Sequence, residues 1–172
     1  MDNKQNMHRC CFTGHRPEKL YITETEIKSR LERAIQQAVS DGFTTFISGM
    51  SRGVDMWAAE TVIKMRENNP QIKLICASPY RGFEQRWNYN EKQRYNYILF
   101  RADCIRFVCD GYSRFCFQAR NKFMVDNSAR VISAYNGGSG GTRNTVLYAE
   151  SRGVEIVNIL DNTARLQSKA ML

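Results

Sequence analysis

Short apolar runs alternate along this chain with longer segments in which apolar residues recur every three or four positions. The short runs are rich in β-branched, aromatic and cysteine residues, and polar or glycine-containing turns bound them. Runs of this length and composition predict buried β-strands. The predicted strands are Arg9–Thr13, Thr44–Ser48, Ile72–Ala77, Cys104–Cys109, Arg130–Tyr135 and Glu155–Leu160.

The segments between these runs have helical spacing. The first has the clearest boundaries, because Thr23 with Glu26 three residues later forms a capping-box pattern, and Asp41-Gly42 is a stop signal. The predicted helices are Glu24–Ser40, Val54–Glu67, Glu84–Arg101, Gln118–Ser128 and Thr142–Ser151.

Strands that alternate with helices in this way predict βαβ units and a parallel sheet. We therefore expect an α/β fold: a single Rossmann-like, doubly wound domain over residues 1–172, with a mostly parallel sheet, helices on both faces and a core of about residues 8–160. In such folds ligands bind outside the carboxyl ends of the strands, so the loops that follow strands carry the candidate chemistry.

The first two of these loops combine glycines with polar side chains. After the first strand, a tight turn could present a cationic clamp and a histidine acid or base, although solvated turn residues explain the pattern equally well. After the second strand, two glycines flank a serine and an arginine directly before a helix, where an anion would be stabilised. The candidate ligand-binding residues here are Gly14, His15, Arg16, Gly49, Ser51, Arg52, Gly53 and Asp55.

The third loop, after the strand that ends at Ala77, begins a stretch in which aromatic and basic residues alternate. Aromatic faces beside guanidinium groups can stack on nucleic-acid bases, but core or dimer packing explains most of these residues better. Tyr80 and Arg81 are the members expected to contact a ligand.

The fourth loop, NGGSGGTRNT, lies between a strand and a helix and is unusually rich in glycine. Residues without a Cβ let backbone N–H groups approach a phosphate closely, although a mobile surface loop is the alternative. The stretch is neither a Walker A sequence nor a strict GxGxxG fingerprint. Its candidate ligand-binding residues are Gly137, Gly138, Ser139, Gly140, Gly141 and Thr142.

Arg120 opens the helix before the fifth strand. Its side chain could point into the crevice at the sheet edge, or it could form a surface ion pair with Asp126. The sequence leaves these alternatives equal.

Composition narrows the partners further. The formal net charge is +8, which favours anionic partners such as nucleotides, phosphorylated metabolites or nucleic acid. No apolar run is long enough to span a membrane and the N-terminus lacks the apolar core of a secretory signal, so we expect no membrane partner and a cytoplasmic location. The six cysteines are expected to be buried free thiols, and no metal site is predicted.

Three segments resemble the YpsA-like proteins of the SLOG superfamily, which also includes the DprA/Smf and LOG proteins: TGHRP, SGMSRGVDMWAAE and ARNKFMVDNSA. The resemblance covers about residues 9–159 and implies a Rossmann-like domain that binds a nucleotide-type ligand. It assigns Gly49, Gly53 and Asp55 to a first ligand-binding motif, and Gly138, Ser139, Gly141 and Thr142 to a second. LOG enzymes carry a glutamate shortly after the second motif, where this chain has Arg143-Asn144-Thr145, so the resemblance supplies no reaction.

The favoured prediction is a sensor or regulatory domain for a nucleotide or ADP-ribose-like ligand, with no cofactor assigned beyond that ligand. One alternative is a nucleotide-processing hydrolase or glycosyl-bond enzyme, for which Asp55, His15 and Arg120 are the candidate catalytic residues. A further alternative is a DprA-type binder of single-stranded nucleic acid. Tyr95, Tyr97 and Phe115 suggest a homodimer surface.

Overall fold

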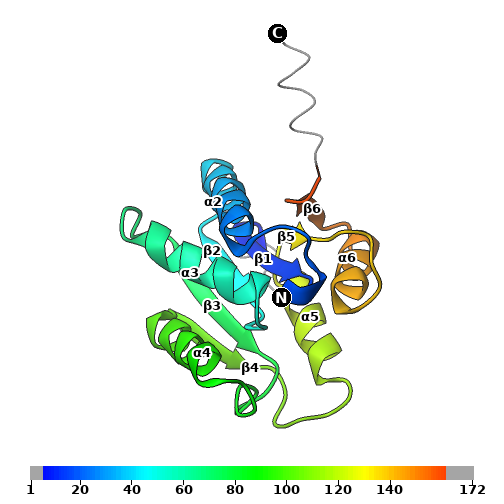
Figure 1. Ribbon diagram of the computed structural model, residues 1–172. Helices are drawn as coiled ribbons and strands as arrows, with labels where there is room; N and C mark the ends of the chain where they lie inside the picture. The colour runs from blue at the N-terminus through cyan, green and yellow to red at the C-terminus, as the bar shows by residue number, and fades with distance from the viewer. Residues whose placement is uncertain (1–5, 162–172) are drawn as a thin grey trace.

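In the computed structural model, which describes residues 6–161, six parallel strands form one sheet with helices on both faces (Figure 1). The strand order is β4-β3-β2-β1-β5-β6, so the chain builds outward from β1 to β4 and then returns to the other side of β1. This confirms the predicted Rossmann-like α/β fold. The strands are β1 (Arg9–Gly14), β2 (Thr45–Ser48), β3 (Lys73–Ser78), β4 (Cys104–Phe107), β5 (Arg130–Ala134) and β6 (Glu155–Asn158).

Helices α2, α3 and α4 cover one face of the sheet, and α5 and α6 cover the other (Figure 1). Within the part of the chain that the structure describes, no helix is both long and apolar enough to cross a bilayer. The helical elements are η1 (Pro17–Lys19), α2 (Glu24–Ser40), α3 (Val54–Arg66), α4 (Tyr89–Arg101), α5 (Cys116–Asp126) and α6 (Gly141–Ser151).

The core is divided between the two faces of the sheet, because successive strand residues point to opposite sides. Phe12 and Phe46 belong to the larger cluster beneath α2, α3 and α4. Their strand neighbours Cys11 and Ile47 belong to the smaller cluster beneath α5 and α6. Burying an aliphatic or aromatic side chain of this size stabilises a fold by about 1.5–3 kcal/mol, so both faces anchor the strands firmly.

Helix α2 follows its sequence signals closely. Thr23 Oγ1 accepts a hydrogen bond from the Glu26 N–H at 3.2 Å, which confirms the predicted cap. Ile27, Leu31 and Ile35, at helical spacing, are fully buried against the sheet.

The prediction that a helix begins at Glu84 was wrong, since α4 begins at Tyr89. The preceding residues form turns, and the backbone of Asn88 is extended, with a ψ of 165°, so an α-helix cannot run through that residue. Asn88 then starts the helix, because its side-chain oxygen accepts the Glu91 N–H at 2.9 Å. The segment before α4 is therefore free to turn toward the carboxyl edge of the sheet.

Two expectations about buried and exposed side chains need correction. Cys104 is exposed and Cys109 is half-buried, because β4 is an edge strand with little cover, whereas the other four cysteines are buried free thiols as expected. Tyr95 is fully buried and its hydroxyl lies 2.7 Å from Ser78 Oγ, so it cannot belong to a dimer surface. Tyr97 and Phe115 are exposed.

Candidate ligand-binding site

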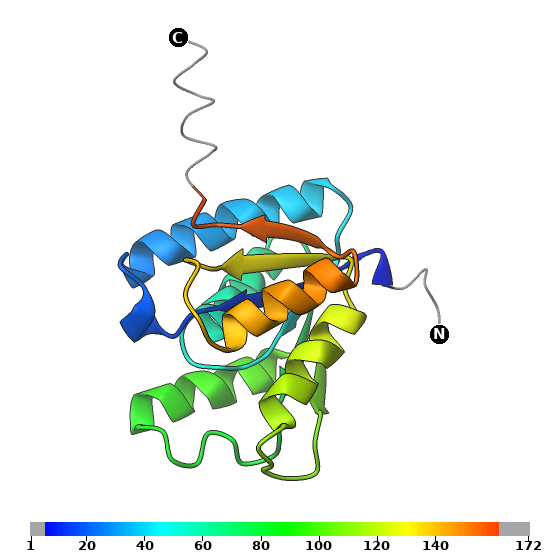
Figure 2. The same cartoon turned by 90° about the vertical axis from the view of Figure 1, so that its right-hand side faces the viewer.

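A cavity of about 260 Å³ lies at the carboxyl ends of the central strands. In Figure 2 the β5 and β6 arrows point to the side where η1 and the start of α6 lie. The chain order reverses between β1 and β5, so the cavity occupies the switch point where ligands bind in open α/β sheets. Its lining residues are Thr13, Gly14, His15, Arg16, Lys19, Ser51, Arg52, Asp55, Phe83, Trp87, Phe117, Arg120, Asn121, Ser139, Gly140, Gly141 and Thr142.

The N-terminus of α6 forms one wall of this cavity. Gly140 is the N-cap residue with a φ of +128°, a conformation that L side chains rarely adopt. No side chain caps the helix and no acidic residue stands in its first turn. The first N–H groups of a helix lack intrahelical acceptors, and Gly141 and Thr142 line the cavity, so this helix start is suited to an anion.

The loop that leads into α6 is fixed at its beginning by Asn136. The Asn136 side chain accepts the Gly138 N–H at 3.0 Å and donates to the Lys19 carbonyl at 3.1 Å. This amide joins the glycine-rich loop to η1, so the loop and the first-strand turn close over the same cavity.

His15 lies at the end of β1 and is only 4 % exposed. Its ring packs against Tyr135, with ring centroids 5.6 Å apart, and a Cβ placed on Gly138 would lie 3.8 Å from His15 Cε1. Among the described residues Nε2 has no hydrogen-bond partner. Burial, together with the nearby Lys19 charge, lowers the pKa of His15.

The N-terminus of α3 forms the opposite wall and is organised around Asp55. Asp55 Oδ2 accepts the Ser51 N–H at 3.2 Å and lies 3.9 Å from Arg120 Nη1. Arg120 also donates to the Gly49 carbonyl through Nη1, and to Ser51 Oγ at 3.3 Å through Nη2. Both charged residues are buried, Arg120 at 5 % and Asp55 at 6 % exposed.

This buried pair answers the question that the sequence left open for Arg120. Its guanidinium reaches the β2–α3 loop and the cavity, while Asp126 accepts from Tyr148 and lies beside Arg152. Burial raises the pKa of Asp55, and the positive charge of Arg120 opposes that rise. A Cβ on Gly49 would lie 2.6 Å from Arg120 Nη1, so only glycine permits this approach.

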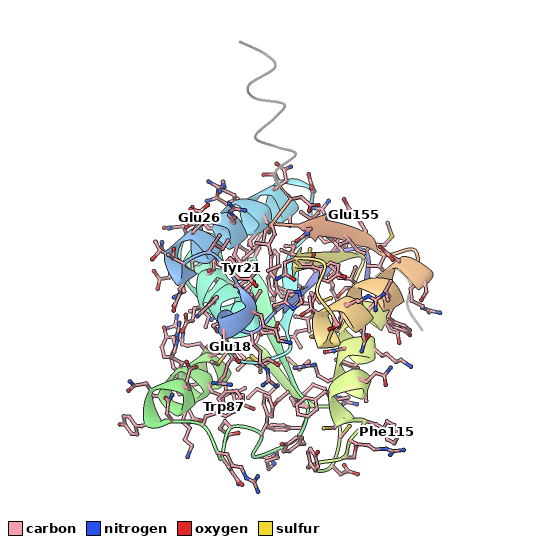
Figure 3. The ribbon with its side chains drawn as sticks, turned by 45° about the vertical axis from the view of Figure 1, so that its right-hand side comes forward. Glu18, Tyr21, Glu26, Trp87, Phe115 and Glu155 are labelled. Carbon is pink, nitrogen blue, oxygen red and sulfur yellow. The ribbon has the colours of Figure 1, made fainter. Side chains whose placement is uncertain are left out.

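Aromatic side chains form a third wall. Phe83 and Trp87 meet edge to face with ring centroids 4.9 Å apart, and Phe117 lies 5.6 Å from Phe83. Figure 3 labels Trp87 in the segment before α4, and that residue lines the cavity. Tyr80 packs behind Phe83 at 5.7 Å, and the Arg81 guanidinium lies over the Phe107 ring, so neither residue lines the cavity.

Most of the predicted binding residues converge on this cavity. Those that lie outside its lining are Gly49 and Gly53, which shape the β2–α3 loop, and Tyr80, Arg81, Gly137 and Gly138. Sequence reasoning did not predict Lys19, Phe83, Trp87 or Phe117 as ligand contacts. The sequence HRPEK held a signal for Lys19, because a proline after Arg16 favours the start of a helical turn.

The lining is strongly cationic, with Asp55 as its one carboxylate against Arg16, Lys19, Arg52 and Arg120. Within the described residues no three His, Cys, Asp or Glu side chains are placed to hold a metal ion. The arrangement is therefore suited to an anionic group at the α6 N-terminus and an aromatic group at the opposite wall.

A doubly wound sheet with an uncapped helix N-terminus and cations at its switch point defines a Rossmann-type protein. The chain belongs to the YspA SLOG family, whose model matches residues 10–155. It is similar to a UPF0398 protein of Bacillus cereus strain B4264, with 27% identity over 154 residues that cover 85% of this chain and 84% of that protein. A UPF0398 protein of Bacillus pumilus strain SAFR-032 is 27% identical over 132 residues, covering 72% and 71%.

Two solved structures share the fold. DNA processing protein A (DprA) from Streptococcus pneumoniae aligns with a TM-score of 0.62 and 21% identity, over 90% of this chain and 52% of DprA. This chain therefore spans about half the length of that protein. DprA from Helicobacter pylori aligns with a TM-score of 0.61 and 18% identity, over 98% of this chain and 76% of that one. Family membership supports nucleotide or nucleic-acid binding as the general kind of function.

Proposed function

We propose that the cavity binds a nucleotide or nucleotide derivative through its phosphate, and that the protein acts as a ligand sensor or regulatory domain. The observation that carries this proposal is the α6 N-terminus, which faces the cavity without a side-chain cap or an acidic first turn. An anion at that position would accept hydrogen bonds from the first N–H groups of α6, which no side chain among the described residues caps.

The energetics favour a phosphate over a neutral group. Each hydrogen bond from a backbone N–H to a charged oxygen contributes about 1.5–3 kcal/mol, and the helix dipole adds about 0.3–1 kcal/mol. Arg16, Lys19 and Arg52 lie on the cavity lining and add long-range attraction. Together these terms support binding of a phosphate-bearing ligand in the micromolar range.

The aromatic wall favours a nucleotide over a simpler phosphate. Phe83, Trp87 and Phe117 present ring surface to the same cavity that holds the α6 N-terminus. Stacking of a base on an aromatic side chain contributes about 1–3 kcal/mol. A ligand with a phosphate at one end and a base at the other would use both walls.

A sensor role is supported over the hydrolase alternative by the state of Asp55. A glycosidic hydrolase needs a carboxylate within reach of the sugar. Asp55, the carboxylate of this cavity, is held by Arg120 and the Ser51 N–H. We therefore expect binding without turnover.

Calorimetric titration with AMP, ADP, ADP-ribose, adenosine and inorganic phosphate tests this proposal. The phosphate-bearing nucleotides should bind at micromolar concentration, and adenosine and phosphate alone should bind much more weakly. Chromatography of each incubation should show no free base or new nucleotide. Heat changes indistinguishable from buffer dilution for all three nucleotides would refute the proposed function.

A matched pair of aromatic variants tests the location. Trp87→Leu should weaken ADP binding by about tenfold, which corresponds to one lost stacking contact. Tyr97→Leu removes an exposed aromatic residue of α4 outside the cavity and should bind as the wild type does. Equal losses in both variants would place the ligand elsewhere.

Single-stranded DNA is the second candidate, because DprA from Helicobacter pylori, whose fold this chain shares, has a single-stranded DNA binding mode. The excess of basic residues in this chain is compatible with such a ligand. An oligo-dT probe followed by fluorescence anisotropy should then show affinity that falls steeply with salt. Tight nucleotide binding with no anisotropy change would exclude DNA as the partner.

A further inference from the structure

The proposed phosphate site contains one buried polar atom that the fold itself does not satisfy. His15 Nε2 is buried in the cavity lining and has no hydrogen-bond partner among the described residues. Buried polar atoms are satisfied in the great majority of cases, so an unsatisfied one inside a cavity suggests a partner supplied from outside the chain. The imidazole lies between the β1 turn and the glycine-rich loop, beside Gly138.

The charges around this imidazole are mainly positive. Arg16 and Lys19 come from its own turn, Arg52 and Asp55 from the β2–α3 loop and α3, and Arg120 from α5; Tyr135 of β5 packs on the ring. The part of α6 and its loop that lines the cavity contributes no charged side chain. Asp55, the carboxylate among these groups, is already paired with Arg120.

We propose that binding of a phosphate-bearing ligand at the α6 N-terminus is coupled to uptake of one proton by His15, whose Nε2–H then donates to a phosphate oxygen. This inference rests on the proposed function and adds a dependence on pH to it. The proton comes from solvent, no covalent bond forms or breaks, and the proton returns to solvent when the ligand leaves.

The surroundings of the His15 ring determine whether ligand affinity rises or falls with pH. In the free protein, burial and the Lys19 charge lower the pKa of His15, so the imidazole is neutral at pH 7. An anionic phosphate beside the ring favours the imidazolium and raises that pKa. Between the free and bound pKa values, affinity should rise as pH falls, by at most about tenfold per pH unit for one proton.

The change in the His15 pKa can be measured on the wild-type protein, because the sequence contains two histidines, His8 and His15. His8 is exposed and lies against the Gly42 carbonyl, outside the cavity lining, so it serves as an internal reference. NMR titration of ¹⁵N-histidine-labelled protein should show that the pKa of His15 in the free protein lies below the ordinary value of a histidine. Saturating ADP-ribose should raise the His15 pKa and leave the chemical shifts of His8 at a fixed pH unchanged.

ADP-ribose is the appropriate probe, because a phosphomonoester such as AMP itself titrates near pH 6, with a second pKa of about 6. Calorimetry of ADP-ribose binding in buffers of different ionisation enthalpy then counts the protons taken up. In the wild type and in His8→Gln, affinity should rise severalfold between about pH 7.5 and pH 6, with proton uptake approaching one per ligand. In His15→Gln, whose amide can still donate, the affinity should be independent of pH and uptake should vanish.

The outcomes separate this inference from the proposed function. ADP-ribose binding that is independent of pH in the wild type, with an unchanged His15 pKa, overturns proton coupling and leaves nucleotide binding intact. Proton uptake that persists in His15→Gln assigns the proton to another group and also overturns it. If the wild-type protein binds none of AMP, ADP and ADP-ribose, both the proton coupling and the proposed function are contradicted.

Discussion

Helices α3 and α6 both follow a glycine-containing loop and share the same kind of N-cap, but they differ at their second residue. Each helix has a glycine N-cap with a positive φ, +87° at Gly53 and +128° at Gly140, and neither has a side-chain cap. The second residue of α3 is Asp55, and the second residue of α6 is Thr142. Both helices begin at the same cavity. They differ at their second residue, which is negatively charged in α3 and uncharged in α6.

This difference teaches that a glycine-rich loop before a helix does not by itself define a ligand site. At α3 the negative charge is built in and neutralised by Arg120, which ties the β2–α3 loop to α5. At α6 the second residue is Thr142, no acidic residue stands in the first turn, and this helix start lines the cavity. We therefore regard the α3 loop as a structural clamp that shapes the cavity and the α6 loop as the part that we propose to hold the ligand.

Breaking the clamp should give the largest effect. Arg120→Met leaves the Asp55 carboxylate buried beside apolar atoms, and loss of one partner of a buried pair costs about 3–5 kcal/mol. Urea unfolding should show this loss as a lower midpoint at unchanged slope. Arg114→Met, at an exposed arginine, is the matched control and should stay within about 0.5 kcal/mol of the wild type.

A double variant refines this test. Asp55→Leu combined with Arg120→Met removes both charges, so the pair should lose less stability than Arg120→Met alone. A double variant as unstable as the sum of the two single variants would mean that the pair does not act as a unit.

Making α6 resemble α3 should weaken ligand binding strongly. Thr142→Asp places a carboxylate at the position that Asp55 holds in α3, where it would compete with the ligand phosphate for the same N–H groups. Loss of one charge-assisted hydrogen bond corresponds to a roughly 10–150-fold weaker affinity for ADP. Thr142→Asn has a similar shape without the charge and should bind within about threefold of the wild type. Equal affinities of the two variants for ADP would mean that the phosphate does not bind at the α6 N-terminus.

The next largest effect should come from a substitution at Gly140, the N-cap residue of α6. Gly140→Ala forces a side chain into a φ of +128°, at a cost of about 1–3 kcal/mol, and the strained N-cap should also weaken ADP binding. Gly111→Ala is the control, since that glycine has no positive φ and no heavy atom within 4 Å of an added Cβ. Thermal unfolding measures the stability change, and ADP titration measures the affinity. A Gly140→Ala protein with wild-type stability would show that this conformation relaxes without cost.

The sequence was sufficient for the fold and brought most of the candidate residues to one cavity, but it did not give the contacts inside that cavity. Apolar patterns predicted the six strands and five α-helices that the structure describes in residues 6–161, although the predicted start of α4 was wrong, because burial imposes those periods locally. The pairing of Arg120 with Asp55 was not predictable, since it joins residues from α5 and α3 through tertiary packing. The same reason explains why Phe117 was missed, and why Tyr80 and Arg81 pack outside the cavity lining.

The smallest effect should come from Lys19, an exposed cation of η1 whose Nζ lies 4.0 Å from a Cβ placed on Gly140. Exposed charges are screened by water and salt and contribute about 0–1 kcal/mol, so Lys19→Gln should weaken ADP binding by roughly twofold to fivefold. The same substitution removes a charge that lowers the pKa of His15, so that pKa should rise in the free protein. Raising the salt concentration to about 0.5 M should erase the affinity difference while leaving the stability gap between the wild type and Arg120→Met almost unchanged, because buried pairs are screened much less. If Lys19→Gln instead reduced affinity as strongly as Thr142→Asp, the anion would be bound by the cations at the cavity rim rather than by the backbone of α6.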